Sequence, residues 1–136
     1  MEPKRVPPEV ARDLMEKEGY VYVDVRSTQE FEQGHPAGAY NVPLLHMGPG
    51  GMIPNPDFMG VMEKSFQRDA KLVLGCKAGG RSLTAATMLL AAGFKTVVDQ
   101  RAGFDGTPFE AGWRPRALPV SLSAPAGHTY EGLRSK

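Results

Sequence analysis

Hydrophobic residues along this chain fall into two kinds of segment that alternate. Short runs of β-branched and aromatic residues, nearly continuous in apolarity, predict strands that are buried on both faces. Longer segments with apolar residues three or four positions apart predict helices with one buried face. The predicted strands span residues 20–26, 39–44, 71–76 and 96–100. The predicted helices span residues 7–19, 27–34, 55–66 and 81–94, with a weaker helix near 104–112.

Local signals mark the ends of several of these elements. Gly19 and Gly93 follow two predicted helices, and glycine commonly ends a helix. Ser27 and Glu30 stand three positions apart at the start of another, which is the spacing of a capping box. Residues 46–56, rich in glycine and proline, predict a turn-rich connection. These boundaries leave the alternation of strands and helices intact.

The alternation of strands and helices favours the α/β class. It predicts a three-layer sandwich, with a central, mostly parallel sheet of about five strands and helices on both faces. Ligands of such sheets bind beyond the carboxyl ends of the strands. The only cysteine, Cys76, lies at the carboxyl end of the strand predicted over residues 71–76.

The last part of the chain shows no helical or strand periodicity. We expect one domain over residues 1–117 and an extension without a recognised motif over residues 118–136. Judged on its own, that extension is predicted to be flexible.

Composition restricts the classes of function. The 136 residues are 41% hydrophobic and 23% charged, which is typical of one globular domain. The formal net charge of +1 gives no field that would attract nucleic acid or an anionic membrane, and no apolar run is long enough to span one. A single cysteine excludes an intramolecular disulfide, and no cluster of ligands predicts a metal site. We therefore expect a reducing, cytoplasmic location, with which a removed organellar presequence is also compatible.

The segment "CKAGGR" at residues 76–81 carries the chemistry. Gly79 and Gly80 let backbone N–H groups turn inward, and the start of the next helix adds unpaired donors and partial positive charge. Such a concavity binds anions and stabilises a thiolate. A lone cysteine is more often a small buried apolar residue, but Lys77 and Arg81 make these surroundings polar. The pattern predicts a thiol that attacks or carries an anionic group.

Two stretches resemble one family. "DVRSTQEFEQGHPAGAYNVP" at residues 24–43 is similar to the rhodanese signature, and "CKAGGRS" at residues 76–82 resembles the active-site loop of single-domain rhodaneses. The resemblance covers residues 6–115, most of the chain. It implies the rhodanese-like fold and thiosulfate sulfurtransferase activity, without a metal or an organic cofactor.

By this resemblance, Cys76 is the nucleophile that takes a sulfane sulfur from a donor such as thiosulfate and becomes a persulfide. An acceptor such as cyanide or a thiol then removes the sulfur. Arg81 would orient or neutralise the donor. The residues expected to bind donor and persulfide are Lys77, Ala78, Gly79, Gly80 and Arg81.

Four polar residues of the first stretch are assigned structural roles. We expect Arg26 to pair with Glu30, and Asp24 to accept hydrogen bonds from nearby backbone N–H groups, because buried charges need partners. For His35 a hydrogen bond that stabilises a turn is expected, rather than general-base catalysis.

Other functions remain as alternatives. A persulfide-carrying or sulfur-sensing module that delivers sulfur to a protein partner would use the same thiol. A phosphatase or arsenate reductase is disfavoured, because the loop from Cys76 to Arg81 has six residues and phosphatases of similar fold use one more. The expected partners are a small anionic sulfur donor and a thiol acceptor such as thioredoxin or glutathione. A monomer or a homodimer is expected.

Overall fold

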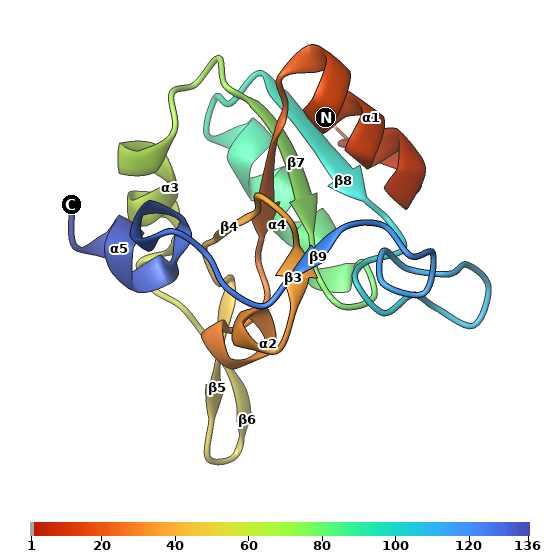
Figure 1. The fold of residues 1–136 in the computed structure, drawn as a ribbon. Coiled ribbons are helices and arrows are strands. Elements are labelled where there is room, and N and C mark those ends of the chain that lie inside the picture. The colour runs from red at the N-terminus through yellow and green to blue at the C-terminus, as the bar shows by residue number, and fades with distance from the viewer. Residues whose placement is uncertain (1) are drawn as a thin grey trace.

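The computed structural model describes residues 2–136 and is organised around a five-stranded parallel sheet (Figure 1). All four neighbouring pairs of strands run parallel, and Val23 lies opposite Leu74 in the register. The α/β class and the parallel sheet are thereby confirmed, although the first strand was not predicted. The strands in spatial order are β1 (Lys4–Val6), β8 (Thr96–Gln100), β7 (Lys71–Gly75), β2 (Val21–Asp24) and β4 (Tyr40–Asn41).

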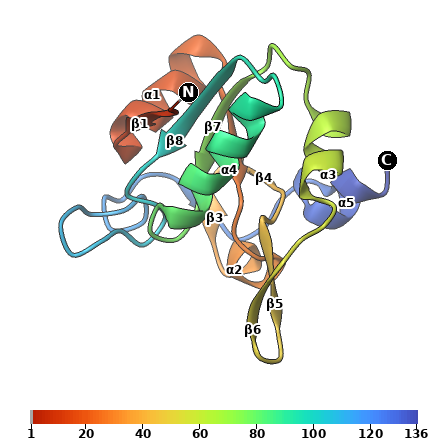
Figure 2. The ribbon, with the colours of Figure 1, turned by 180° about the vertical axis from the view of Figure 1, so that it is seen from behind.

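Helices cover both faces of this sheet, as predicted (Figures 1 and 2). The strands are buried on both sides, so successive residues of β7 serve different cores: Leu72 and Leu74 pack on one face and Val73 on the other. One core lies against the first helix and the other against the next two long helices. These helices are α1 (Pro8–Glu18), α3 (Phe58–Ser65) and α4 (Gly80–Ala91).

A short helix, α2 (Thr28–Glu32), follows β2 directly. The hydroxyl of Ser27 accepts the backbone N–H of Glu30 at 3.3 Å, and the carboxylate of Glu30 accepts the backbone N–H of Ser27 at 3.1 Å. This is the predicted capping box, and it satisfies two donors that a helix of five residues would otherwise leave unpaired.

Two connections differ from the prediction. Most of residues 46–56 belong to a β-hairpin of β5 (Leu45–Gly48) and β6 (Gly51–Pro54), which projects from the body of the protein (Figure 1). Pro49 and Gly50 form its two-residue turn. The helix predicted near 104–112 is wrong: this stretch consists of turns around one bridge between Gly106 and Ala111. Pro108 and the nearby glycines disfavour a helix there.

Residues 118–136, which taken alone suggested flexibility, are ordered and pack on the domain. The segment contains β9 (Val120–Ser121), a 3₁₀ turn η1 (Ala126–His128) and α5 (Tyr130–Arg134). β9 pairs with the two-residue strand β3 (His35–Pro36), and α5 lies beside α3 (Figure 1).

Buried aromatic and aliphatic side chains hold this tail against the domain. Tyr130 and Leu133 belong to the same core as β7 and α4. The imidazole of His128 stacks on the ring of Tyr40, with 3.7 Å between the ring centroids. The tail is therefore an integral part of the packed structure.

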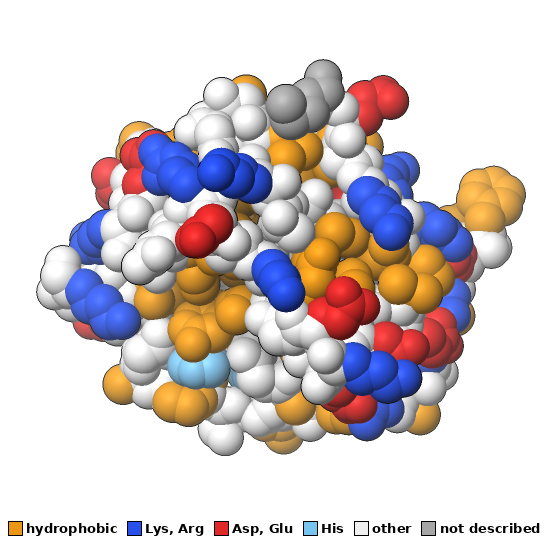
Figure 3. All heavy atoms as spheres, turned by 90° about the horizontal axis from the view of Figure 1, so that it is seen from above, with side chains coloured by type: hydrophobic (Ala, Val, Ile, Leu, Met, Phe, Trp, Pro, Cys, Tyr) orange, Lys and Arg blue, Asp and Glu red, His pale blue; other side chains and the backbone are white. Residues whose placement is uncertain are grey.

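The surface carries no broad region of one sign on the face seen in Figure 3, where acidic and basic side chains are interspersed with hydrophobic ones. This fits the nearly balanced formal charge of the chain. Within residues 2–136, no helix combines the length and the apolar character that crossing a membrane requires.

Shortening Leu133 to alanine tests the role of the tail. Leu133 is only 1% exposed, so Leu133→Ala removes buried methyl groups and should lower the free energy of unfolding by about 2–5 kcal/mol. Leu122, 70% exposed in the same segment, is the matched control, and Leu122→Ala should change it by less than about 0.5 kcal/mol. Urea-induced unfolding measures both, and equal effects would mean that the tail does not stabilise the fold.

Candidate active site

The thiol loop begins where β7 ends. Cys76 follows Gly75, the last residue of that strand, and α4 begins four residues later at Gly80. Cys76 is 2% exposed, and its Sγ accepts the backbone N–H of Gly79 at 3.0 Å. The loop therefore curls back over the sulfur, and a backbone dipole already points at it.

The residues that follow Cys76 in the sequence supply further backbone donors. Within the described chain, the N–H groups of Lys77, Ala78, Gly80 and Arg81 make no hydrogen bond to a protein acceptor. The last two open the twelve-residue helix α4, whose first turn has unpaired N–H groups and partial positive charge. The loop thus offers several donors to a negative charge carried on the sulfur.

Gly79 is required by the path of the chain. Its φ of +98° lies in the region that residues with a side chain rarely adopt. A Cβ placed on it would lie 2.2 Å from the carbonyl oxygen of Arg101, in the segment that follows β8. The loop over Cys76 can therefore close only with glycine at this position.

A buried carboxylate anchors the other end of the loop. Asp99, near the end of β8, accepts the hydroxyl of Ser82 from the first turn of α4 and the Nε–H of Arg5 from β1. Burial raises the pKa of this carboxyl group, and the bonds from Ser82 and Arg5 only partly offset that rise. Asp99 thereby fixes α4, and so the loop, relative to the sheet.

The guanidinium of Arg81 is engaged in a two-point ion pair. Its two terminal nitrogens donate to the two carboxylate oxygens of Glu30, at 2.8 and 3.0 Å. The expected pair between Arg26 and Glu30 is wrong, because Glu30 turns towards the thiol loop instead. That Arg81 binds the donor stays a prediction. The guanidinium of Arg81 is already paired with the carboxylate of Glu30.

Arg26 pairs with its near neighbour Asp24. The guanidinium donates to both Asp24 oxygens and to the carbonyl oxygen of Gly34, and it lies 4.3 Å from the ring centroid of Phe104. Asp24 also accepts the backbone N–H of Arg26 at 3.0 Å, the type of bond that the sequence predicted for it. These two buried charges hold the end of β2 in place.

His35 is buried, and each of its ring nitrogens lies within hydrogen-bond distance of a carbonyl oxygen. Nδ1 lies 2.8 Å from the carbonyl oxygen of Phe31, and Nε2 lies 3.1 Å from that of Ser123 in the tail. The ring also stacks on that of Phe31. The local hydrogen bond was predicted; the link to the tail was not.

A hollow of about 230 Å³ opens at the rim of the loop. It adjoins the residue after Cys76, Lys77, and extends to the segment that follows β8. The residues around it are Arg26, Glu30, Gln33, Gly34, Lys77, Phe104, Asp105 and Arg114. Cys76 itself does not line it, and neither do Asp24, His35 and Arg81.

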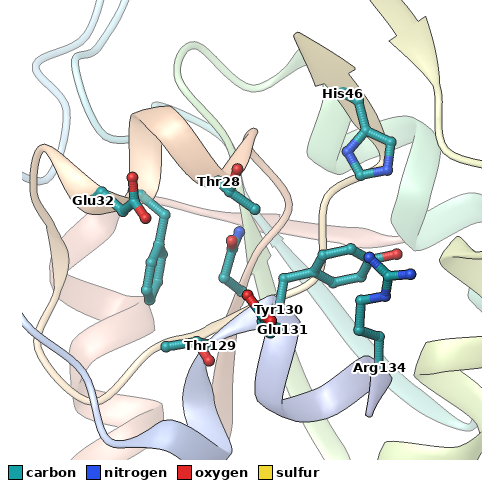
Figure 4. A pocket seen from close by; sticks show the side chains of 9 residues that line it. Thr28, Glu32, His46, Thr129, Tyr130, Glu131 and Arg134 are labelled. Atoms are coloured by element: carbon teal, nitrogen blue, oxygen red, sulfur yellow. The ribbon is translucent and has the colours of Figure 1, made fainter.

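A second hollow, of about 440 Å³, lies between α2 and the tail (Figure 4). Thr28 and Glu32 line it from α2, while Tyr130 and Arg134 come from α5. No residue of the thiol loop lines this hollow. In the described part of the chain, no three His, Cys, Asp or Glu side chains are grouped so that they could hold a metal ion.

Comparison with known proteins agrees with this geometry. The family model for the rhodanese-like domain matches residues 7–107, which contain the thiol loop and both signature stretches. The chain belongs to the rhodanese family. Its fold is likewise that of a rhodanese-like domain.

Curated relatives of this rhodanese domain include plant proteins. It is 41% identical over 118 residues to thiosulfate sulfurtransferase 16, chloroplastic, from Arabidopsis thaliana, covering 87% of this chain and 92% of that protein. It is 40% identical to senescence-associated protein DIN1 from Raphanus sativus, covering 87% of this chain but only 61% of the relative. Against the crystal structure of Rv0390 from M. tuberculosis the TM-score is 0.76 at 23% identity, covering 90% of this chain and all of that one, a likeness of fold alone.

Several residues that shape the site of this rhodanese domain were not predicted. Asp99 lies in the strand predicted over residues 96–100 with no role assigned to it, although an acidic residue at the carboxyl end of a buried strand is a signal for a polar anchor. Arg114 lies beyond the segment that the family model matches. Asp105 precedes it at the rim of the loop.

The ion pair of Glu30 predicts a specific dependence of stability on pH. Burial alone raises the pKa of this carboxyl group, but hydrogen bonds from Arg81 and Ser27 outweigh burial and lower the pKa from 4.5 to about 2. The stabilisation is therefore complete above the ordinary pKa and is lost as the pH falls towards 2.

Glu30→Gln should thus be destabilised relative to the unchanged protein at neutral pH, and the difference should shrink as the pH is lowered from about 5 to about 2. Urea unfolding at a series of pH values measures it. Glu18→Gln, at the exposed end of α1, is the charge-matched control. A difference that stays constant with pH would contradict the assigned pKa.

Proposed function

We propose that this rhodanese domain is a sulfurtransferase that moves a sulfane sulfur from thiosulfate or a similar anionic donor to a thiophilic acceptor. The observation that carries the proposal is the setting of Cys76. Its thiol accepts the N–H of Gly79 inside a loop whose other N–H groups have no protein acceptor in the described chain. The family and the name of the Arabidopsis relative support the same activity.

The first half-reaction needs no cofactor. The Cys76 thiolate attacks the outer sulfur of thiosulfate, a new S–S bond forms, and the bond to the sulfonate sulfur breaks. Sulfite leaves with the electron pair of that bond, and Cys76 keeps one extra sulfur as a persulfide. In the second half-reaction the acceptor attacks the terminal sulfur, and the Cys76 thiolate is the leaving group. Cyanide becomes thiocyanate in this way, and a thiol becomes a persulfide.

The loop suits the intermediate better than it suits the free thiol. A persulfide places negative charge one bond further from the backbone of residue 76, where the unpaired N–H groups of Lys77 to Arg81 can converge on it. The partial positive charge at the start of α4 favours the same anion. No general base is required when the sulfur is already ionised.

Loop size supports sulfur chemistry over phosphoryl chemistry. Six residues run from Cys76 to Arg81, and the backbone closes tightly enough for Gly79 to touch the sulfur. A phosphate cradle needs a wider ring of donors around four oxygens. The proposed function is therefore sulfur transfer, not phosphate hydrolysis.

The acceptor must come from outside the chain. Cys76 is the only cysteine, so no internal thiol can discharge the persulfide. We propose that a thiol such as that of thioredoxin or glutathione accepts the sulfur from Cys76 during turnover. The alternative is that Cys76 delivers the sulfur to a protein partner. The proposed compartment is a reducing one such as the cytoplasm; the Arabidopsis relative carries the word chloroplastic in its name.

Replacement of the thiol tests the proposal directly. Cys76→Ala should abolish transfer of sulfur from thiosulfate to cyanide, by at least about a thousandfold, because the nucleophile is removed. The far-ultraviolet circular dichroism spectrum should not change. Mass spectrometry of the unchanged protein after thiosulfate treatment should show the mass of one added sulfur on the peptide that contains Cys76. Transfer by Cys76→Ala at the rate of the unchanged protein would refute the mechanism.

A further inference from the structure

Positive side chains near the thiol loop differ in whether they already have a partner. Arg81 is held by Glu30, and Arg26 is held by Asp24. Lys77 and Arg114 form no ion pair with a carboxylate within residues 2–136. Lys77 and Arg114 are therefore available to a ligand, whereas Arg81, the arginine of the loop motif, is already paired.

Both of these cations line the 230 Å³ hollow at the rim of the loop. Glu30 and Arg26 line it too, but each is neutralised by the partner just named. The charges left facing the hollow are Lys77 and Arg114 against the single carboxylate of Asp105. The hollow therefore has an excess of positive charge beside the residue that follows Cys76.

The backbone around Arg114 is held in place from several sides. Its N–H donates to the carbonyl oxygen of Phe104 at 3.0 Å. The preceding residue, Trp113, is buried and donates its indole N–H to the carbonyl oxygen of Pro119 at 2.8 Å. The position of Arg114 is therefore fixed relative to the hollow before any ligand arrives.

The side chain of Arg114 also has a prepared place. The guanidinium carbon lies 5.7 Å from the ring centroid of Phe104. The guanidinium also lies against Gly34, where an added Cβ would be 3.3 Å from the Nη1 atom of Arg114. The φ of Gly34 is +138°, so glycine is favoured there for the backbone and leaves room for the guanidinium.

We propose that Lys77 and Arg114 form a two-point subsite for a dianionic sulfur donor, and that Arg114 determines the preference for two charges over one. This inference rests on the proposed function and names its substrate class: a small donor of two negative charges, with a charged oxyanion group at one end and a transferable sulfur at the other. The planar fork of arginine suits two oxygens of such a group, and the lysine adds a point charge. Arg114 lies outside residues 7–107, so this half of the subsite is not part of the matched family segment.

The experiment compares two donors on one enzyme. Thiosulfate is a dianion, and an alkanethiosulfonate offers the same sulfur–sulfonyl bond with one charge. Arg114→Gln should lower kcat/KM for thiosulfate by roughly tenfold, mainly through KM, and that for the alkanethiosulfonate by less than about threefold. Lys77→Gln should act in the same direction.

Two further variants make the result decisive. Lys95→Gln removes one exposed positive charge at the amino end of β8, the opposite end of the sheet, and should leave both donors unaffected. Asp105→Asn removes the opposing carboxylate and should lower KM for thiosulfate. Urea midpoints equal to that of the unchanged protein would show that the variants are folded.

The outcomes separate this inference from the proposed function. If the unchanged protein takes up no sulfur on Cys76 from thiosulfate, the proposed function fails. If it takes up sulfur but Arg114→Gln leaves kcat/KM unchanged, or weakens both donors equally, the subsite is refuted and the proposed function stands. A loss in Lys95→Gln as large as that in Arg114→Gln would reduce the effect to general charge and overturn the assignment as well.

Discussion

The carboxylate of Glu30 is the contact on which the geometry of the thiol loop depends. It accepts the backbone N–H and the hydroxyl of Ser27 at the start of α2, and it accepts both terminal nitrogens of Arg81 in the first turn of α4. One side chain thus joins the segments that follow two neighbouring strands, β2 and β7. Since Arg81 is occupied in this way, the proposed subsite assigns recognition of an anion to Lys77 and Arg114.

Much of the fold could be predicted because its signals are local. The buried strands β2, β7 and β8 are continuous apolar runs, and the capping box lies within four consecutive residues. The missed elements depend on distant partners. Lys4–Val6 becomes a strand only by pairing with Val98–Gln100, and α5, with five residues, is too short to show a helical period. Its burial of Tyr130 and Leu133 is a property of the assembled core.

The candidate site likewise has a part that could be predicted from local sequence and a part that could not. Cys76 and its glycine loop were recognisable from the residues alone, because a strand, a loop and a helix in that order dictate where the thiol stands. Ion partners were not, since a charged side chain pairs with whatever the fold brings near it. Arg26 pairs with Asp24, two positions away, whereas Arg81 pairs with Glu30, fifty-one positions away. Arg114 lines the hollow from a segment with no recognisable pattern, next to the buried Trp113.

The solitary thiol has a consequence for how such a protein behaves in a mixture of donors and acceptors. Because Cys76 is the only cysteine, each molecule carries either one extra sulfur or none. Donor and acceptor must therefore react at the same sulfur atom, one after the other. Under the proposed function, the loaded fraction at any moment records the ratio of supply to demand for reactive sulfur. The mass of the peptide that contains Cys76 would therefore report this loaded fraction.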